Sequence, residues 1–158
     1  IKVASGVTFV ATANIGNEYT ATRQLDKALM DRFTVIEMDN LTQEEEFGLL
    51  KYLFPTLDES SLEQVSNITS LTRAEALTEN ARISSGVSTR TAVEIGGLLF
   101  DGFSLLESAD ITIYPQYDNT GGVDSERTFV KQIVQKFVSD GSDENLFSEH
   151  DIAESDEI

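Results

Sequence analysis

Residues 7–33, VTFVATANIGNEYTATRQLDKALMDRF, are the stretch that decides the predicted fold. Residues 7–13 form a nearly continuous run of small, apolar and β-branched side chains. Such a run is typical of a strand buried on both faces, as in a parallel sheet covered by helices. Residues 24–32 follow as a helix, in which Leu25 and Leu29 lie one turn apart and can face the sheet. The stretch therefore predicts α/β structure.

Two polar side chains stand at the ends of these predicted elements. Asn14 follows the strand, at the edge where ligands bind in open α/β sheets. It either faces such a ligand or only caps its own turn. Arg32 closes the helix, where a cation is favoured by about 0.3–1 kcal/mol; its alternative role is to reach across an interface toward a phosphate. A second short strand is predicted over residues 34–39.

Helices dominate the prediction for the rest of the chain. Thr42 and Glu45 have the spacing of a capping box, in which each side chain satisfies a backbone donor of the first helical turn. Pro55 stops the helix that this box opens, because the residue before a proline resists helical dihedral angles. A second helical region is predicted over residues 58–83.

A third, long helix is predicted from Ser88 to Leu106. Arg90 lies in its first turn, where the helix dipole disfavours a cation. This placement indicates either an anionic partner, such as a bound phosphate, or a salt bridge to a nearby glutamate. Gly96 and Gly97 in the middle of the helix each cost roughly 1 kcal/mol relative to alanine, which a close helix–helix approach would explain.

The remaining residues are predicted to be loop, helix and tail. Residues 108–122 form a loop that contains a short strand at 111–114. Residues 123–138 form a last helix, whose apolar face packs either on the same body or on a partner. Residues 139–158 hold eight acidic residues and no lysine or arginine. Such a block is predicted to be disordered.

The composition excludes several classes of function. The chain has 158 residues, a net charge of −17 and no cysteine. The negative charge argues against nucleic-acid binding through a broad basic face, and the lack of cysteine excludes disulfides and thiolate metal sites. The single histidine, His150, lies in the acidic tail and forms no metal-binding pair. No apolar run approaches the roughly 18 residues of a membrane span, and no secretion signal is visible, which fits a cytoplasmic protein.

Three motifs follow one another along the chain. A predicted strand ends in ATAN at residues 11–14, a predicted helix ends in DRF at 31–33, and GVSTR at 86–90 opens a later helix. Together they resemble the AAA+ ATPases, most closely the MoxR-like branch that includes the ATPase subunit of cobaltochelatase. The resemblance covers roughly residues 3–107. It implies the end of a P-loop parallel-sheet core followed by an α-helical lid bundle.

The resemblance also implies roles for individual residues. Asn14 would be sensor 1 and orient the water that attacks the γ-phosphate of ATP. Arg32 would be an arginine finger that reaches the ATP of a neighbouring subunit in a homo-oligomeric ring. Arg90 would be sensor 2, which contacts the γ-phosphate and couples the position of the lid to the nucleotide state. Arg90 and Asn14 would thus belong to the ATP site, whose ATP and Mg²⁺ would be held mainly by upstream motifs that this chain lacks. Arg23 is a further candidate for an interface cation.

By the same resemblance the chain has four parts. Residues 1–40 would be the carboxyl-terminal part of the α/β core, with sensor 1 and the arginine finger. Residues 41–107 would be the helical lid with sensor 2. Residues 108–138 would be a loop and a carboxyl-terminal helix, and residues 139–158 an acidic, disordered tail.

The chain departs from the family pattern at the nucleotide-binding motifs. A P-loop requires G-x-x-x-x-G-K-[ST], and no Gly-Lys pair occurs in the sequence. The acidic pair that holds Mg²⁺ is also missing. We therefore expect that these 158 residues alone neither bind ATP tightly nor hydrolyse it. Because the chain begins at Ile1, shortly before an apolar run, we expect it to be the carboxyl-terminal part of a longer polypeptide; a trimmed amino terminus is the alternative.

Two functions of different classes follow from these observations. In the first, the chain is the sensor and lid portion of a ring-forming ATPase that remodels a partner protein or assists chelatase-type metal insertion. In the second, it is a non-catalytic acidic helical adaptor, or a degenerate AAA+ interaction module, that binds a protein partner. A third possibility is a nucleic-acid-dependent motor, which differs from the first in the substrate that it handles.

Overall fold

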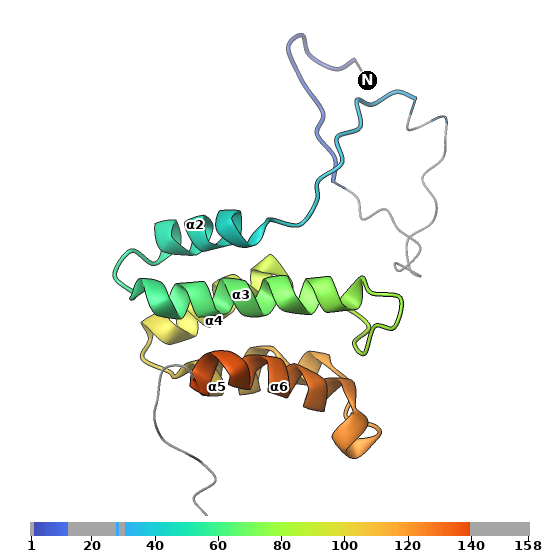
Figure 1. Cartoon of the computed structure of the whole chain (residues 1–158). Coiled ribbons are helices and arrows are strands. Elements are labelled where there is room, and N and C mark those ends of the chain that lie inside the picture. The colour runs from blue at the N-terminus through green and yellow to red at the C-terminus, as the bar shows by residue number, and fades with distance from the viewer. Residues whose placement is uncertain (1, 13–27, 29–30, 140–158) are drawn as a thin grey trace, which may run out of the picture. The chain divides into compact units, whose positions relative to one another are not determined.

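The structure is a computed structural model that describes residues 2–12, 28 and 31–139. It divides into two units, residues 1–39 and 40–158. In the described part of the second unit, all regular secondary structure is helical (Figure 1). Their bounds are α2 Gln43–Leu53, α3 Glu59–Ala76, α4 Thr89–Phe100, α5 Leu105–Thr112, η1 Tyr114–Gln116, η2 Gly122–Asp124 and α6 Glu126–Ser139, where η1 and η2 are short 3₁₀ helices.

The predicted α/β fold is wrong for the part of the chain that the structure describes. Residues 2–12 and 31–39 contain no strand, and so no parallel-sheet core is seen. A strand requires a neighbour that accepts its backbone hydrogen bonds, and these segments have no such neighbour among the described residues. Their apolar side chains lie exposed, as in Val10 and Met38, which are 88% and 91% exposed. The predicted helix over 24–32 lies mostly outside the described residues.

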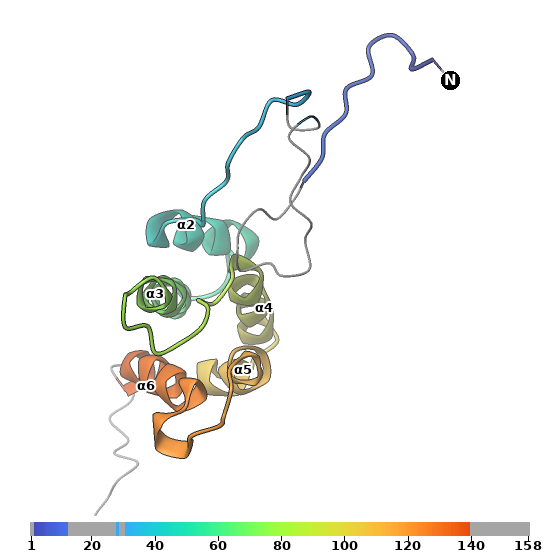
Figure 2. The same cartoon turned by 90° about the vertical axis from the view of Figure 1, so that its right-hand side faces the viewer.

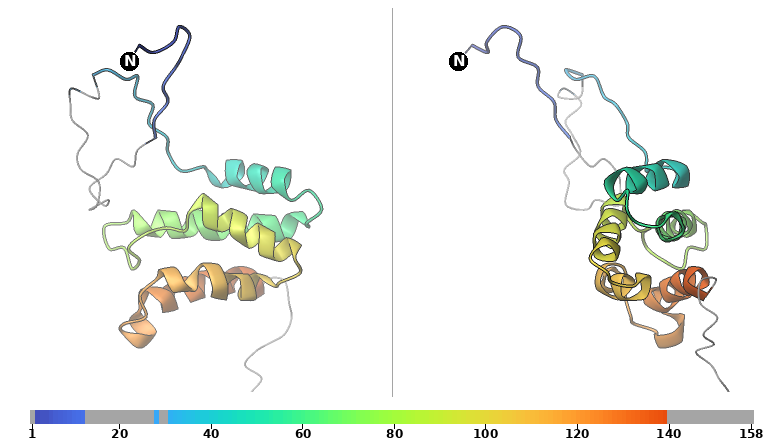
Figure 3. Two further views of the ribbon diagram at one scale, coloured as in Figure 1. Left: turned by 180° about the vertical axis from the view of Figure 1, so that it is seen from behind. Right: turned by 90° about the vertical axis from the view of Figure 1, so that its left-hand side faces the viewer.

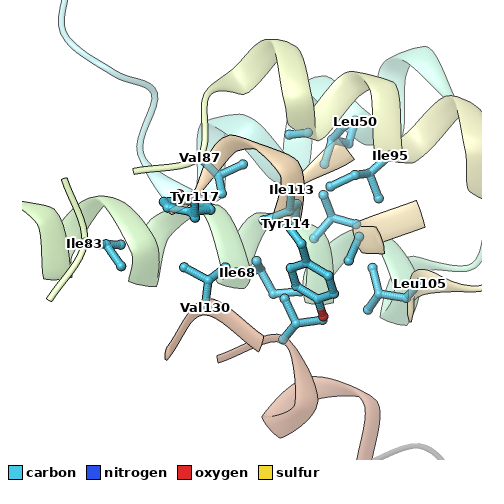
Figure 4. Close-up of a cluster of buried hydrophobic side chains, with 14 of the residues drawn as sticks. Leu50, Ile68, Ile83, Val87, Ile95, Leu105, Ile113, Tyr114, Tyr117 and Val130 are labelled. Carbon is cyan, nitrogen blue, oxygen red and sulfur yellow. The ribbon is translucent and has the colours of Figure 1, made fainter. Parts of the chain in front are cut away.

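The second unit is a bundle in which the helices surround one apolar core. Viewed along α3, the bundle has α3 and α6 on one side and α4 and α5 on the other (Figure 2). Helix α2 packs against α3 and α4, and α6 packs against α3 and α5; the views in Figure 3 agree with this arrangement. The core side chains shown in Figure 4 come from all of these helices and from the connections between them. The core residues with no exposed area include Leu50, Leu62, Val65, Ile68, Val87, Ile95, Ile113, Val130 and Val134.

The first two helices begin as the sequence predicts. The Thr42 hydroxyl accepts a hydrogen bond from the Glu45 backbone N–H at 3.3 Å, and the Glu45 carboxylate accepts one from the Thr42 N–H at 2.9 Å. This confirms the capping box. Helix α2 ends at Leu53, with Phe54 as its cap residue just before Pro55. Asp58 caps α3 by accepting a hydrogen bond from the backbone N–H of Ser61.

The single long helix predicted from Ser88 to Leu106 is wrong, because the chain breaks it at Gly102. Gly102 adopts a φ of 94°, which favours glycine. Its N–H donates to the carbonyl of Leu99, and the N–H of Phe103 donates to the carbonyl of Leu98, which is the pattern of a Schellman helix end. A capping box that starts at Ser104 then opens α5. Apolar residues continue at helical spacing on both sides of Gly102, so the sequence pattern does not reveal that the helix ends there.

Two further predictions are corrected. Helix α3 ends at Ala76 and not at residue 83, because the chain must leave the helix for Ile83 to reach the core; Leu77 is already 87% exposed. The short strand predicted over 111–114 is instead the end of α5 and the start of η1, where the helical backbone buries the consecutive residues Ile113 and Tyr114 and leaves Ile111 exposed. The last helix is confirmed as α6, and its apolar face packs on the same body.

Candidate functional site

The sequence predicts Asn14, Arg32 and Arg90 as site residues, and the structure describes the last two. Asn14, like Arg23, lies outside the described residues. Arg32 is exposed, and its guanidinium Nη1 donates to the carbonyl oxygen of Ala28 at 2.6 Å. This contact leaves both roles considered for Arg32 open, because residues 29 and 30 lie outside the described residues. Arg90 lies in the first turn of α4. Because Arg32 and Arg90 belong to different units, only Arg90 has a described structural setting in the helical bundle.

Arg90 is presented at the amino-terminal end of α4. The Ser88 hydroxyl caps this end by accepting a hydrogen bond from the Thr91 N–H at 3.2 Å. The Arg90 side chain is exposed. Among the described residues it makes no salt bridge, so the glutamate partner considered from the sequence is not present there. The first turn of α4 thus combines an exposed guanidinium with the partial positive charge of a helix amino terminus.

A buried ion pair lies behind this turn. Glu46 of α2 is fully buried, and its carboxylate accepts a hydrogen bond from Nη2 of Arg73, on α3, at 2.7 Å. The other Glu46 oxygen accepts a hydrogen bond from the Thr69 hydroxyl. Two charges removed from water require such partners, because an unpaired buried charge is costly. Every buried side-chain polar atom in the described ranges has a hydrogen-bond partner.

The same arginine fixes the start of α4. Arg73 Nε donates to the Val87 carbonyl at 2.8 Å, Nη2 donates to the Thr89 hydroxyl at 3.2 Å, and Nη1 donates to the Leu41 carbonyl at 3.2 Å. The Val87 N–H donates to the hydroxyl of Thr72 at 3.0 Å. Both backbone groups of Val87 are therefore held by α3, and the position of the first turn of α4 depends on Arg73.

Gly86 allows this close approach. A Cβ atom on Gly86 would lie 2.5 Å from the Cα of Arg73, which no packing permits without a backbone shift. On the other side of the loop, the hydroxyl of Tyr117 donates to the carbonyl of Ser85 at 3.0 Å. Burial, and secondarily the charge of Glu126, raise the pKa of Tyr117 to about 12, so this phenol stays a hydrogen-bond donor across the physiological range. The loop that leads into α4 is thus held by α3 through Val87 and by Tyr117 through Ser85.

Sequence reasoning missed Glu46 and Arg73, although a signal was present. Glu46 lies one turn before the buried Leu50 on α2, which is a position of the core-facing stripe. Arg73 follows the buried Thr72 at the end of the corresponding stripe on α3. When two adjacent helices each carry a charged residue at a core-facing position and the two charges are opposite, the pattern predicts a buried ion pair.

Other site chemistries find no support in the described ranges. No group of three or more metal-ligating side chains occurs among the described residues. The helices described there also lack the length and apolar character that crossing a membrane requires. The arrangement around α4 can bind an anion through Arg90 and can present a surface to another polypeptide.

The chain is similar to a named protein over part of that protein's length. It is 37% identical over 109 residues to the protein named "Putative chaperone BssE" from Thauera aromatica. The aligned region covers 68% of this chain and 36% of that protein, so the chain spans only about a third of the length of its relative. No protein-family model matches the chain. The comparison thus links these residues to a protein named as a chaperone.

Proposed function

We propose that residues 40–139 form a protein-interaction domain of a chaperone-type protein, and that this chain contributes binding of another polypeptide rather than catalysis. The observation that carries the proposal is the similarity, over 109 residues, to a protein whose name describes a chaperone. The helical bundle supports it, because its core is closed by its own helices. Such a body can present side chains to a partner without first having to fold upon it.

Binding of an unfolded protein tests this proposal directly. The probe is reduced, carboxamidomethylated lysozyme, a basic polypeptide, labelled with a fluorophore and titrated with the 158-residue chain. We expect the fluorescence anisotropy to rise with a saturable curve, and unlabelled probe to compete. Native lysozyme, which carries the same basic side chains in a folded state, is the matched control and is expected to bind far more weakly. An anisotropy that stays flat up to the highest soluble concentration of the chain would refute the interaction function.

A specific observation supports a second, more detailed function. We propose that the bundle is the lid of an AAA+ ring ATPase of the MoxR-like type, with Arg90 as sensor 2 for the γ-phosphate of ATP–Mg²⁺ bound elsewhere in the longer protein. Asn14 and Arg32 keep their proposed roles as sensor 1 and arginine finger. The supporting observation is that Arg90 is exposed and lacks a salt bridge among the described residues, while the turn that carries it is held by Arg73.

ATP turnover of the full-length protein tests this second function. Arg90→Ala and Arg32→Ala are each expected to lower turnover by at least about tenfold, since a cation that contacts a transferring phosphoryl group is worth several kcal/mol. Lys51→Ala is the matched control, because Lys51 is an exposed cation that already pairs with Glu59. Turnover that is unchanged in Arg90→Ala, or absent in the unmodified protein, would refute the ATPase assignment and leave the interaction function standing.

A further inference from the structure

We infer that the outer surface of helices α4 and α5 binds a basic amphipathic segment of a partner polypeptide. This inference rests on the proposed interaction function and adds to it the place of binding and the chemistry of the partner. The α4–α5 surface is defined by exposed residues of these helices and of the turn between them: Glu94, Phe100, Asp101, Phe103, Asp110 and Ile111. Both helices lie on the same side of the bundle (Figure 2).

The surface offers large apolar side chains to solvent. Phe100, Phe103 and Ile111 are 58%, 44% and 57% exposed. The ring of Phe100 lies 6.5 Å from the ring of Phe54, the residue that follows α2, measured between centroids, while more than half of Phe100 stays exposed. Exposed apolar groups that are gathered on neighbouring elements are typical of interaction surfaces. Aromatic side chains in particular serve as anchors in protein interfaces.

The charge around these anchors is negative on balance. Residues 89–112, which span α4 and α5, contain four acidic residues and one cation, Arg90. Glu94, Asp101 and Asp110 are exposed, and none of them forms a salt bridge within the described ranges. Elsewhere on the bundle exposed acids do find cations, as Glu59 does with Lys51. The α4–α5 surface therefore carries more carboxylates than cations.

Gly97 leaves room for a close approach next to Phe100. A Cβ on Gly97 would meet no atom within 4 Å, whereas a Cβ on Gly96 would lie 2.4 Å from the ring of Phe54. Packing inside the bundle thus accounts for Gly96 and not for Gly97. A glycine in mid-helix costs roughly 1 kcal/mol relative to alanine, and a partner backbone that approaches this position would account for its presence.

The negative charge of the α4–α5 surface determines which class of partner it can bind. Nucleic acids and anionic lipid surfaces carry phosphates, which an acidic surface repels. A second copy of this chain is also disfavoured, because the chain carries a net charge of −17. A polypeptide segment with lysine or arginine beside apolar residues at helical spacing satisfies both features, since its apolar side chains cover the phenylalanines and its cations meet the carboxylates.

Two synthetic peptides test the inference. Both are amphipathic helices of leucine with one charged residue type, lysine in the first peptide and glutamate in the second, and both are labelled for anisotropy titration with the 158-residue chain. We expect only the lysine peptide to bind. Phe100→Ser and the double variant Asp101→Asn with Asp110→Asn are each expected to weaken its affinity by about tenfold, the effect typical of a central anchor. Added salt should weaken binding less in the double variant.

Matched controls separate this site from nonspecific attraction. Leu77→Ser and Glu79→Gln remove an exposed apolar group and an exposed charge from the turn after α3, and neither is expected to change the affinity. Circular dichroism shows that each variant is folded. Equal losses in the control and test variants would overturn the inference. A dimer in sedimentation that Phe100→Ser dissociates would also overturn it, since a second copy would then cover the surface.

The outcome for the unfolded lysozyme probe distinguishes the two levels of proposal. If the unmodified chain binds that probe while the lysine peptide fails to bind, the interaction function stands and the α4–α5 surface is wrong. If neither probe binds, the interaction function itself is wrong. If both bind and Phe100→Ser weakens the binding of both, the α4–α5 surface is supported as the place of binding.

Discussion

The buried region behind the start of α4 and the exposed first turn of α4 each contain an arginine, and the two differ in every respect. Arg73 is almost buried and donates hydrogen bonds to Glu46, Thr89 and two backbone carbonyls. Arg90 is exposed and has no salt bridge among the described residues. The difference indicates that Arg73 holds the fold, whereas Arg90 is available to an outside partner.

Burial explains why the two regions differ. A guanidinium removed from water must satisfy its donors inside the protein, and the loss of one partner leaves an uncompensated charge. A guanidinium in water needs no internal partner, and an exposed ion pair would add little. The buried region is therefore expected to contribute to stability, whereas the exposed region is not.

The largest effect is expected for Glu46→Ala. This change leaves the Arg73 guanidinium without its carboxylate in a buried setting and also creates a cavity. The free energy of unfolding is expected to fall by about 3–5 kcal/mol, measured as a lower urea midpoint with an unchanged slope. Glu79→Gln, at an exposed position, is the control and should change it by less than about 0.5 kcal/mol. A loss below about 1 kcal/mol for Glu46→Ala would show that the pair is not structural.

A second prediction compares two glycines near the same helix. Gly86→Ala should destabilise the fold by about 1–3 kcal/mol, since its Cβ would collide with the Arg73 backbone. Gly97→Ala should instead stabilise α4 by up to about 1 kcal/mol, because its Cβ would meet open space in a helix interior. Thermal unfolding of both variants checks the opposite signs. A Gly86→Ala variant that is not destabilised would show that Gly86 does not lie against α3 as described, and a destabilised Gly97→Ala variant would show that Gly97 does not face open space.

A third prediction tests the backbone contact between α3 and α4. Thr72→Val removes the hydroxyl that accepts the Val87 N–H and preserves the shape of the side chain. The unpaired buried N–H should cost about 1–2 kcal/mol of unfolding free energy. Hydrogen exchange at the Val87 amide should accelerate in the variant. Thr78→Val, an exposed threonine after α3, is the control. An unchanged exchange rate would mean that Thr72 does not hold the loop.

The smallest effect concerns the exposed helix ends and depends on pH. Hydrogen bonds from the backbone N–H and then the hydroxyl of Ser104 lower the pKa of Glu107 below its ordinary value of 4.5. The stability from Glu107 is therefore complete above pH 4.5 and is lost as the pH falls through the lower folded-state pKa. Glu107→Gln should lower the melting temperature slightly at pH 7 and flatten its decline in acid. An unchanged acid slope would contradict the capping role.

The sequence predicted where helices start better than where they end, and better than the fold class. Local chemistry sets a capping box, so Thr42 and Glu45 could be read from their spacing alone. A strand depends on a partner strand that local sequence does not reveal, and the run over residues 7–13 accordingly suggested a sheet that the described residues do not form. The break at Gly102 was missed because apolar residues continue on both of its sides.

The candidate site was predictable only in its exposed part. Arg90 stood out because a cation in the first turn of a helix conflicts with the helix dipole. Arg73 and Glu46 lie 27 residues apart and on different helices, so only the packing of α2 on α3 brings them together. Long-range pairs of this kind require the tertiary structure, and the hydrophobic pattern hides them because each occupies a core-facing position.

One measurement tests the central contrast most directly, namely the urea unfolding of Arg73→Met and Arg90→Met in the 158-residue chain. Methionine keeps much of the apolar stem of arginine and removes its charge and donors. We expect Arg73→Met to lower the free energy of unfolding by about 3–5 kcal/mol and Arg90→Met to change it by less than about 0.5 kcal/mol. Equal losses in the two variants, or a larger loss in Arg90→Met, would contradict the assignment of one arginine to the fold and the other to function.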